Sequence, residues 1–116
     1  MEKDRDMDNQ FDSALNNLHR AIVNDYERGG DRDPQRVVEF AEGISFEEGR
    51  KYIKVVKKLG QQSMVWGFIM KEDDKVFQKG DILKAAGWSA PARNRARGNI
   101  LDGDFSWVRW TGPQYL

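Results

Sequence analysis

Residues 51–70 read KYIKVVKKLGQQSMVWGFIM, and this stretch decides the fold that the sequence predicts. Its second part, Met64 to Met70, is a continuous apolar run of strand length, which predicts the central strand of a sheet. Gly67 within that run would let another backbone approach closely. The first part, Lys51 to Leu59, is rich in β-branched residues and lysine, which predicts a strand with an edge or solvent-facing side. A sheet therefore stands at the centre of the expected fold.

A helix is predicted before the sheet, over residues 9–28. Its apolar residues recur at steps of three and four and form one stripe: Phe11, Ala14, Leu15, Leu18, Ala21, Ile22 and Tyr26. Asp8 or Asn9 can cap its start, and the glycines at 29–30 would end it. Residues 1–8 alternate acid and base without apolar spacing, which predicts a solvated tail.

The remaining pattern indicates further short strands. Residues 37–41 (VVEFA) are interpreted as a strand, residues 82–83 as a return to the core, and residues 100–111 as a hairpin that turns at Asp102-Gly103. Together these segments predict an α+β fold, with one N-terminal amphipathic helix packed on an antiparallel β-sheet of about five strands. The sheet falls within residues 36–111 of a single domain that spans residues 9–116.

Composition excludes several classes of protein. The chain has 116 residues, no cysteine and a single histidine, His19, so it offers no disulfide framework, no cysteine-ligated metal and no histidine-rich metal site. There is no run of 18 apolar residues, and the first ten residues lack the apolar core of a signal peptide. We therefore expect a cytoplasmic protein with no cofactor, no metal and no membrane contact.

The formal net charge of zero conceals an asymmetry. Residues 1–49 carry 13 acidic and 6 basic residues, net −7, whereas residues 50–116 carry 6 acidic and 13 basic residues, net +7. Residues 50–116 also hold nine of the thirteen aromatic residues, including all four Trp. This asymmetry indicates either a polyanion-binding part joined to an acidic part, or two parts that neutralise each other in the fold or in an oligomer.

Basic and aromatic residues suitable for nucleic acid concentrate near the C-terminus. Cations hold the phosphates of a single strand while aromatic faces stack on its bases. The candidate nucleic-acid-binding residues are Arg93, Arg95, Arg97, Arg109, Lys54, Trp107 and Trp110. The alternative interpretation places the Trp residues in the core, Arg109 on an ordinary exposed strand and the arginine loop against the acidic helix.

The helix stripe also has two interpretations. Phe11, Leu15, Leu18 and Ile22 either cover the sheet of the same chain or contact a second subunit or partner. A sheet with one helix leaves apolar surface that self-association would cover, so we expect a homo-oligomer.

Catalysis is not expected. The carboxylate pairs at 47–48, 73–74 and 102/104 lie in turns beside glycine or lysine, where both members should be solvated, and general acid/base chemistry needs two different environments in one cleft. The chain also lacks a phosphate-binding loop and a partner set for His19.

Residues 79–116, KGDILKAAGWSAPARNRARGNILDGDFSWVRWTGPQYL, resemble small uncharacterised proteins of tailed bacteriophages. In size and element order the chain is also similar to the Drc-type single-stranded-DNA-binding RNA polymerase cofactors of podophages. That resemblance implies a β core flanked by a helix, self-association, sequence-independent binding of single-stranded DNA and a role in phage transcription or replication.

Two functions are therefore expected from different classes. The first is non-catalytic binding of single-stranded DNA, with RNA as another substrate and an RNA polymerase or replication protein as a partner. The alternative is a protein-interaction factor that binds and redirects or inhibits a host enzyme through the acidic helix or an exposed Trp patch. The discriminating feature is whether the three loop arginines are free or paired with acids of residues 1–49.

Overall fold

The computed structural model of the chain describes residues 2–29 and 33–113. Two helices open the chain, α1 (Glu2–Gly29) and α2 (Pro34–Glu42). The main sheet follows, with strands β1 (Ile44–Glu48), β2 (Tyr52–Leu59), β3 (Gln62–Met70), β4 (Asp81–Leu83) and β5 (Gly98–Asn99). A 3-10 helix, η1 (Ile100–Asp102), leads to the short strands β6 (Val108–Arg109) and β7 (Gly112–Pro113).

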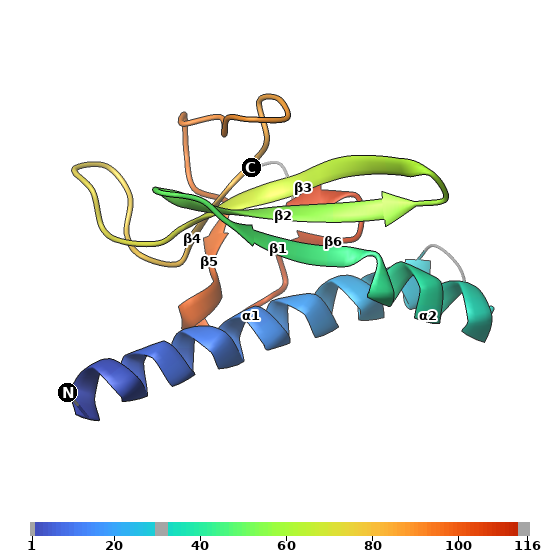
Figure 1. Ribbon diagram of the computed structural model, residues 1–116, viewed down its shortest axis with the longest axis horizontal. Coiled ribbons are helices and arrows are strands. Elements are labelled where there is room, and N and C mark those ends of the chain that lie inside the picture. Colours follow the sequence, from blue (N-terminus) through green and yellow to red (C-terminus); the bar gives the residue numbers. More distant parts are fainter. Residues whose placement is uncertain (1, 30–32, 114–116) are drawn as a thin grey trace.

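The main sheet is antiparallel throughout, with strand order β1-β2-β3-β4-β5 (Figure 1). The apolar run at 64–70 lies in β3, the central strand, as predicted. Between β2 and β3, Val55 faces Gly67 and Val56 faces Val65, which leaves Trp66 as the extra residue of a β-bulge. The bulge therefore directs the largest side chain of β3 into the core.

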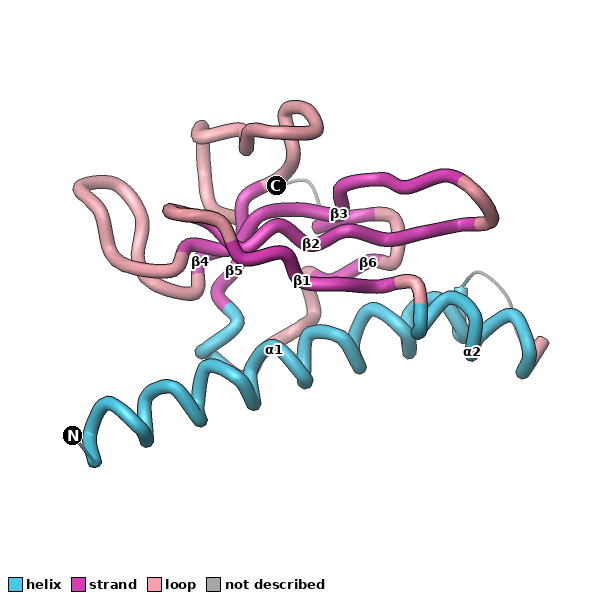
Figure 2. Tube along the Cα trace, viewed as in Figure 1, coloured by secondary structure: helices cyan, strands magenta, loops and turns pink. Residues whose placement is uncertain are grey.

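Helix α1 lies along one face of this sheet (Figure 2). Its apolar stripe supplies Leu18 and Ile22, both fully buried, to the main core cluster, where they meet Ile53, Trp66 and other sheet residues. The chain is thus an α+β protein in which the N-terminal helix covers an antiparallel five-stranded sheet, and the predicted fold class is confirmed.

The start of α1 differs from the prediction. The helix begins at Glu2, so residues 2–8, expected as a tail, have helical backbone and extend beyond the sheet (Figure 1). This segment carries four acidic residues at a helix N-terminus, where the helix dipole favours negative charge. The absence of an apolar stripe in residues 2–8 therefore did not mark the start of the helix.

The strand predicted at residues 37–41 is wrong, because this segment lies in α2. The side chain of Asp33 accepts a hydrogen bond from the Gln35 N–H at 2.9 Å, and Pro34 occupies the first turn. A carboxylate cap followed by proline is a strong helix start, and it outweighs the strand preference of the two valines. Phe40 consequently points into the core and His19 Nε2 lies 2.8 Å from the Ala41 carbonyl, which joins α2 to α1.

The hairpin predicted at residues 100–111 is also wrong. Residues 100–102 form η1, which the Asn99 side chain caps by accepting the Leu101 N–H at 2.8 Å. The Asp104 side chain accepts the Ser106 N–H at 3.0 Å and holds a further turn. Such local side-chain bonds compete with strand pairing, so the only pairing in this part of the described chain is β6 with β7.

The small β6–β7 hairpin packs on the α1 side of the sheet. Trp66 Nε1 donates to the Arg109 carbonyl at 2.8 Å. A Cβ atom on Gly67 would lie 3.1 Å from the Leu83 carbonyl oxygen and 3.3 Å from Pro113 Cγ, so glycine permits the close approach that the sequence predicted.

Candidate nucleic-acid interface

Among the residues that the structure describes, the sheet face opposite α1, called the second face below, is covered by loops. It has its own small core of Phe68, Met70, Phe77 and Leu83. Residues 84–97, the connection that follows β4, rise on this side of the sheet, whereas residues 71–80, the connection that precedes β4, extend from one end of the sheet (Figure 1). In β2 the second face carries Tyr52 and Lys54, since the alternate residues Ile53 and Val55 belong to the α1-side core.

Arg93 lies on the second face but is already bound. Its Nη1 donates to the Tyr52 hydroxyl at 2.6 Å, and its Nη2 donates to Asp74 Oδ2 at 2.6 Å. The guanidinium carbon is 4.8 Å from the centre of the Phe77 ring. Arg93 therefore ties the loop at 84–97 to the loop at 71–80, and its acidic partner comes from its own part of the chain.

The three loop arginines do not form one basic surface. Arg95 is exposed, whereas Arg97 is 3% exposed and its Nη2 donates to the Asn94 side chain at 3.4 Å. The Arg97 N–H donates to the Ile82 carbonyl at 2.8 Å, which draws this residue against β4 just before β5 begins. Arg97 as a phosphate contact is therefore wrong for this conformation, because strand pairing buries it.

Both predicted Trp side chains pack into or against the α1-side core. Trp107 is 8% exposed, its indole N–H donates to the Asp104 carbonyl at 2.8 Å, and its ring fills the space beside Gly98. Trp110 is half-buried and meets Tyr26 edge-on at 5.2 Å between ring centres. Both belong to the α1-side core or pack against it, so the interpretation of these two side chains as stacking residues is corrected.

Arg109 and Lys54 are not brought together. Arg109 is exposed, but it lies in the β6–β7 hairpin on the α1 side, and its Nη1 donates to the carbonyls of Ser106 and Val108 at 2.9 and 2.8 Å. Lys54 lies on the second face. The predicted set of seven residues is thus divided between two sides of the sheet.

The predicted oligomer or partner contact is corrected in the same way. Phe11, Leu18 and Ile22 are at most 9% exposed within the chain itself, and Leu15 packs against the same core. This stripe covers the chain's own sheet, which was the other interpretation of the pattern.

Trp88 is the residue that the sequence analysis missed. Its side chain is 51% exposed, and Lys54 Nζ lies 4.4 Å from the centre of its ring in a cation–π contact. It stands in the stretch AAGWSAPA, where every neighbour is small. A large aromatic side chain flanked only by small residues has nothing local to bury it, and that signal was present in the sequence.

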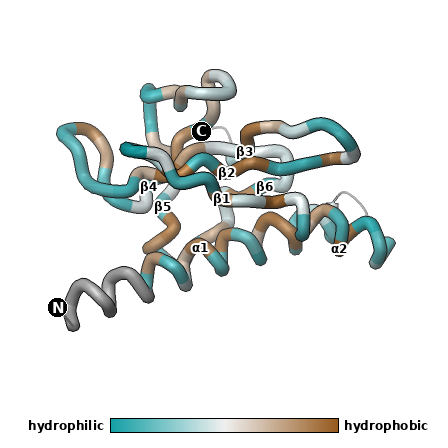
Figure 3. Tube along the Cα trace, in the orientation of Figure 1, coloured by the Kyte–Doolittle hydropathy of each residue, from teal (hydrophilic) through white to brown (hydrophobic). Residues whose placement is uncertain are grey.

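A hollow of about 300 Å³ adjoins this pair. It is lined by Tyr52, Lys54, Phe68 and Ser89 and by residues at and beside the β1–β2 turn, Glu47, Glu48, Gly49, Arg50 and Lys51. The β1–β2 turn is strongly hydrophilic (Figure 3). Glu47 faces Lys54 across β1 and β2, so the charge of this lysine is partly balanced. Arg50 and Arg95 are exposed and make no ion pair with the described residues.

Asp74 is the main acidic group at the second face. The N–H groups of Phe77 and Val76, followed by Arg93, hold the pKa of its carboxyl well below the usual range. Lys51 Nζ lies 3.4 Å from Asp74 Oδ2, the oxygen that Arg93 also contacts. Asp74 therefore stays ionised at neutral pH and pairs with two cations, Arg93 and Lys51, of which Lys51 lines the hollow.

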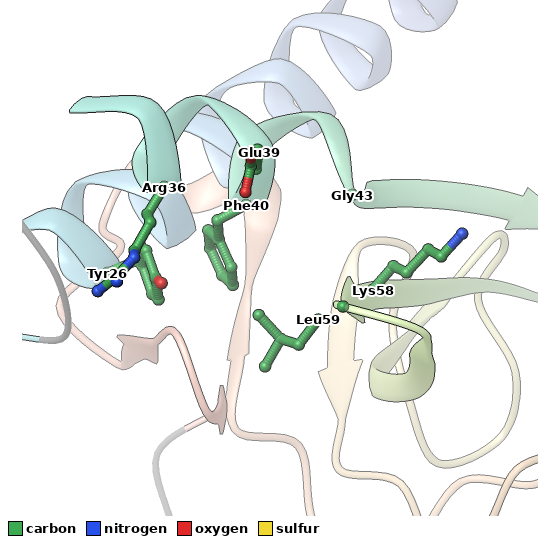
Figure 4. A pocket seen from close by; sticks show the side chains of 8 residues that line it. Tyr26, Arg36, Glu39, Phe40, Gly43, Lys58 and Leu59 are labelled. Atoms are coloured by element: carbon green, nitrogen blue, oxygen red, sulfur yellow. The ribbon is translucent and has the colours of Figure 1, made fainter. Parts of the chain in front are cut away.

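A second hollow, of about 410 Å³, lies between α2 and the end of β2 (Figure 4). Tyr26, Phe40 and Leu59 point into it, whereas Lys58 extends away from them. Tyr26 and Phe40 stack on each other at 4.0 Å between ring centres, so their faces are already occupied on one side. This hollow does not adjoin the basic residues of the second face apart from Lys58.

Within residues 2–29 and 33–113, no three histidine, aspartate or glutamate side chains gather in a way that could hold a metal ion. No helix in the described part of the chain combines the length and apolar character needed to cross a membrane.

Fold and site together define a small α+β protein with a loop-covered sheet face that presents one exposed Trp among cations. Residues 2–115 match the model of a family of unknown function, DUF7717, and the chain belongs to that family. No curated protein and no solved structure matches the chain.

Proposed function

We propose that this chain is a non-catalytic protein that binds single-stranded nucleic acid without sequence preference, through the second face of its sheet. The observation that carries the proposal is Trp88, half exposed beside the ammonium group of Lys54, a residue that lines the hollow. An exposed indole provides a stacking platform for any base, because every base has a π-face. Trp88 takes the stacking role that was predicted for Trp107 and Trp110.

The cations near Trp88 would contact the phosphates. Lys54 holds one side of the indole, Arg50 and Lys51 border the hollow, and Arg95 is exposed in the same loop as Trp88. Because these contacts are electrostatic and independent of the base, affinity should fall steeply with salt and vary little with sequence. Single strands are favoured over duplex because only an unpaired base leaves its face open to an indole.

The supporting experiment is an anisotropy titration of a fluorescein-labelled 20-nucleotide oligo(dT) at about 50 and 200 mM salt. We expect binding at the lower salt and strong weakening at the higher. An oligo(U) of the same length compares RNA with DNA, and an unlabelled duplex competitor tests the preference for single strands.

Trp88→Ala is the decisive variant, and Leu101→Ala is its matched control. Leu101 is also a large exposed apolar residue, 43% exposed, but it lies in η1 on the α1 side. Loss of a stacked base costs about 1–3 kcal/mol, so Trp88→Ala should weaken binding about 5- to 150-fold. Leu101→Ala should bind like the wild type. Equal weakening by both variants would refute the role of Trp88.

If the pure protein binds no oligonucleotide at about 50 mM salt, the proposal fails. The exposed Trp88 would then suit the alternative expected from the sequence, a contact with another protein. A cytoplasmic location and a role beside a polymerase or replication protein form part of the same proposal, and they depend on the titration.

A further inference from the structure

Arg93 and Lys51 come from two segments that are far apart in the chain, yet both contact one carboxylate, that of Asp74. Asp74 Oδ2 lies 2.6 Å from Arg93 Nη2 and 3.4 Å from Lys51 Nζ. The second guanidinium nitrogen, Nη1, donates to the Tyr52 hydroxyl at 2.6 Å. A guanidinium and an ammonium group thus contact the anion that Asp74 supplies, and the Tyr52 hydroxyl accepts a hydrogen bond from the other nitrogen of the same guanidinium.

The same donors suit a phosphate. Arginine forms charge-assisted hydrogen bonds with carboxylate and phosphate alike, and lysine binds phosphate as a point charge. Tyr52 and Lys51 also line the hollow next to Trp88 and Lys54. An anion at this place would therefore lie beside the stacking platform, where the backbone of a bound strand must run.

We infer that Arg93, Lys51 and Tyr52 form a phosphate subsite for the nucleic-acid backbone, and that the Asp74 carboxylate occupies this subsite in the unbound protein. The inference rests on the proposed function, because the phosphate belongs to the strand that stacks on Trp88. Binding then requires the phosphate to displace Asp74 from the two cations.

Asp74 has a second anchor that explains how it keeps its place. Its Oδ1 accepts the N–H groups of Val76 and Phe77 at 2.8 and 2.7 Å, so the carboxylate forms a turn within its own loop. Displacing Oδ2 from the cations leaves this turn intact. Asp74→Asn keeps one oxygen for the two N–H groups and removes the charge, so the variant retains the local turn.

Asp73 provides the matched control. It is the preceding residue of the same loop, and its side chain also accepts a backbone N–H, that of Lys79 at 2.7 Å. It makes no ion pair with Arg93 or Lys51. Asp74→Asn and Asp73→Asn remove the same charge at neighbouring positions, and only Asp74→Asn frees the subsite.

The experiment measures oligo(dT) affinity of the wild type and both variants over a series of salt concentrations, with thermal melts to show that each variant folds. We expect Asp74→Asn to bind about 5- to 20-fold more tightly than Asp73→Asn, and its plot of log K against log salt to steepen by about 0.7 to 1.4, for one or two added phosphate contacts. Equal affinity of the two variants would overturn the inference. Weaker binding by Asp74→Asn would also overturn it, because Asp74 would then position Arg93 for the strand instead of competing with it.

Further arms separate the sources of failure. If inorganic phosphate displaces the oligonucleotide from Asp74→Asn no better than chloride does at equal ionic strength, the subsite takes only phosphate that belongs to a strand. Stronger displacement by phosphate would show that the subsite also takes the free ion. If the wild type binds oligo(dT) in a Trp88-dependent way and the two aspartate variants behave alike, the subsite is wrong and the proposed function stands. If neither the wild type nor Asp74→Asn binds, the proposed function and the subsite fail together.

Discussion

Replacing Gly98 with alanine tests the burial of Trp107, on which the revised site depends. A Cβ atom at position 98 would lie 2.4 Å from both Cε2 and Nε1 of the Trp107 ring and 2.7 Å from Cδ1. The indole cannot retreat freely, because its N–H is bound to the Asp104 carbonyl at 2.8 Å and its other neighbours are core residues. The variant must therefore either displace the ring or distort β5.

The expected cost follows from the size of this clash. Overpacking of a well-packed core costs about 1–3 kcal/mol. Unfolding entropy is about 2.1 cal/mol/K per residue, so a chain of 116 residues loses about 4 °C in melting temperature for each kcal/mol. We expect Gly98→Ala to melt about 4–12 °C below the wild type. Differential scanning fluorimetry measures the shift, and near-ultraviolet circular dichroism reports on the Trp environment.

Gly87→Ala is the control for this prediction. A Cβ atom there would meet nothing within 4 Å, and position 87 is adjacent to Trp88. Its melting temperature should match that of the wild type. If Gly98→Ala also melts like the wild type, with an unchanged near-ultraviolet spectrum, then Trp107 is not held in the core and its exclusion from the binding surface is wrong.

Three further predictions concern other contacts of the fold. Burial lowers the pKa of Lys57, so between that lowered pKa and 10.5 the unfolded chain binds more protons than the folded chain, and the stability of the wild type rises with pH. Lys57→Met should abolish this rise, which urea unfolding at about pH 7 and 10 measures. Trp66→Phe leaves the Arg109 carbonyl without its N–H donor and should lower the free energy of unfolding by about 1–3 kcal/mol in the same assay. An unchanged urea midpoint would show that this hydrogen bond does not stabilise the fold. Because the pKa of Asp74 is depressed in the folded protein, its contribution to stability is complete above about pH 4 and is lost progressively as the pH falls below that value. Asp74→Asn should therefore make stability depend less on pH in the acid range. An unchanged dependence would contradict the lowered pKa of Asp74.

The core of the fold could be predicted because burial leaves a regular pattern in the sequence. The stripe of α1 and the apolar run of β3 each reflect contacts with the main core, and both predictions are confirmed. The errors lie where a cap or a local turn decides the conformation. Asp33 and Pro34 start a helix over residues with a strand pattern, and Asn99 caps a 3-10 turn where a strand was expected.

The site was harder to predict because the exposure of a side chain depends on contacts that are distant in sequence. The spacing of Trp107 and Trp110 in the sequence does not indicate that Trp107 packs against Gly98 or that Trp110 packs against the Tyr26 ring. The spacing of two residues would place Arg97 on the same side of an extended segment as Arg95, yet Arg97 is buried where its N–H donates to the Ile82 carbonyl of β4. Trp88 was identifiable in principle, since its neighbours are all small, but its cation partner Lys54 lies 34 residues away in β2.

The division of charge gains a spatial meaning in the structure. The second face is built from β2, β3 and the two loops around β4, all from the basic part of the chain, whereas α1 and α2 of the acidic part lie on the other side (Figure 1). The partner of Arg93, Asp74, also comes from the basic part. The arrangement therefore supports separate roles for the two parts, although Lys71 and Glu48 do join them at 3.5 Å.

The most direct test of the central claim is to map the bound strand on the ¹⁵N-labelled protein by amide and indole chemical shifts as a short oligo(dT) is added. If Trp88 and the cations near it bind the strand, the shifts should concentrate at residues 49–54 and 84–97. Among the four indole N–H signals, that of Trp88 should move most. The indole signals of Trp66 and Trp107, which are hydrogen-bonded inside the core, should stay in place. Shifts that concentrate on α1 and α2, or a spectrum that does not change, would contradict the claim that the second face binds single-stranded nucleic acid.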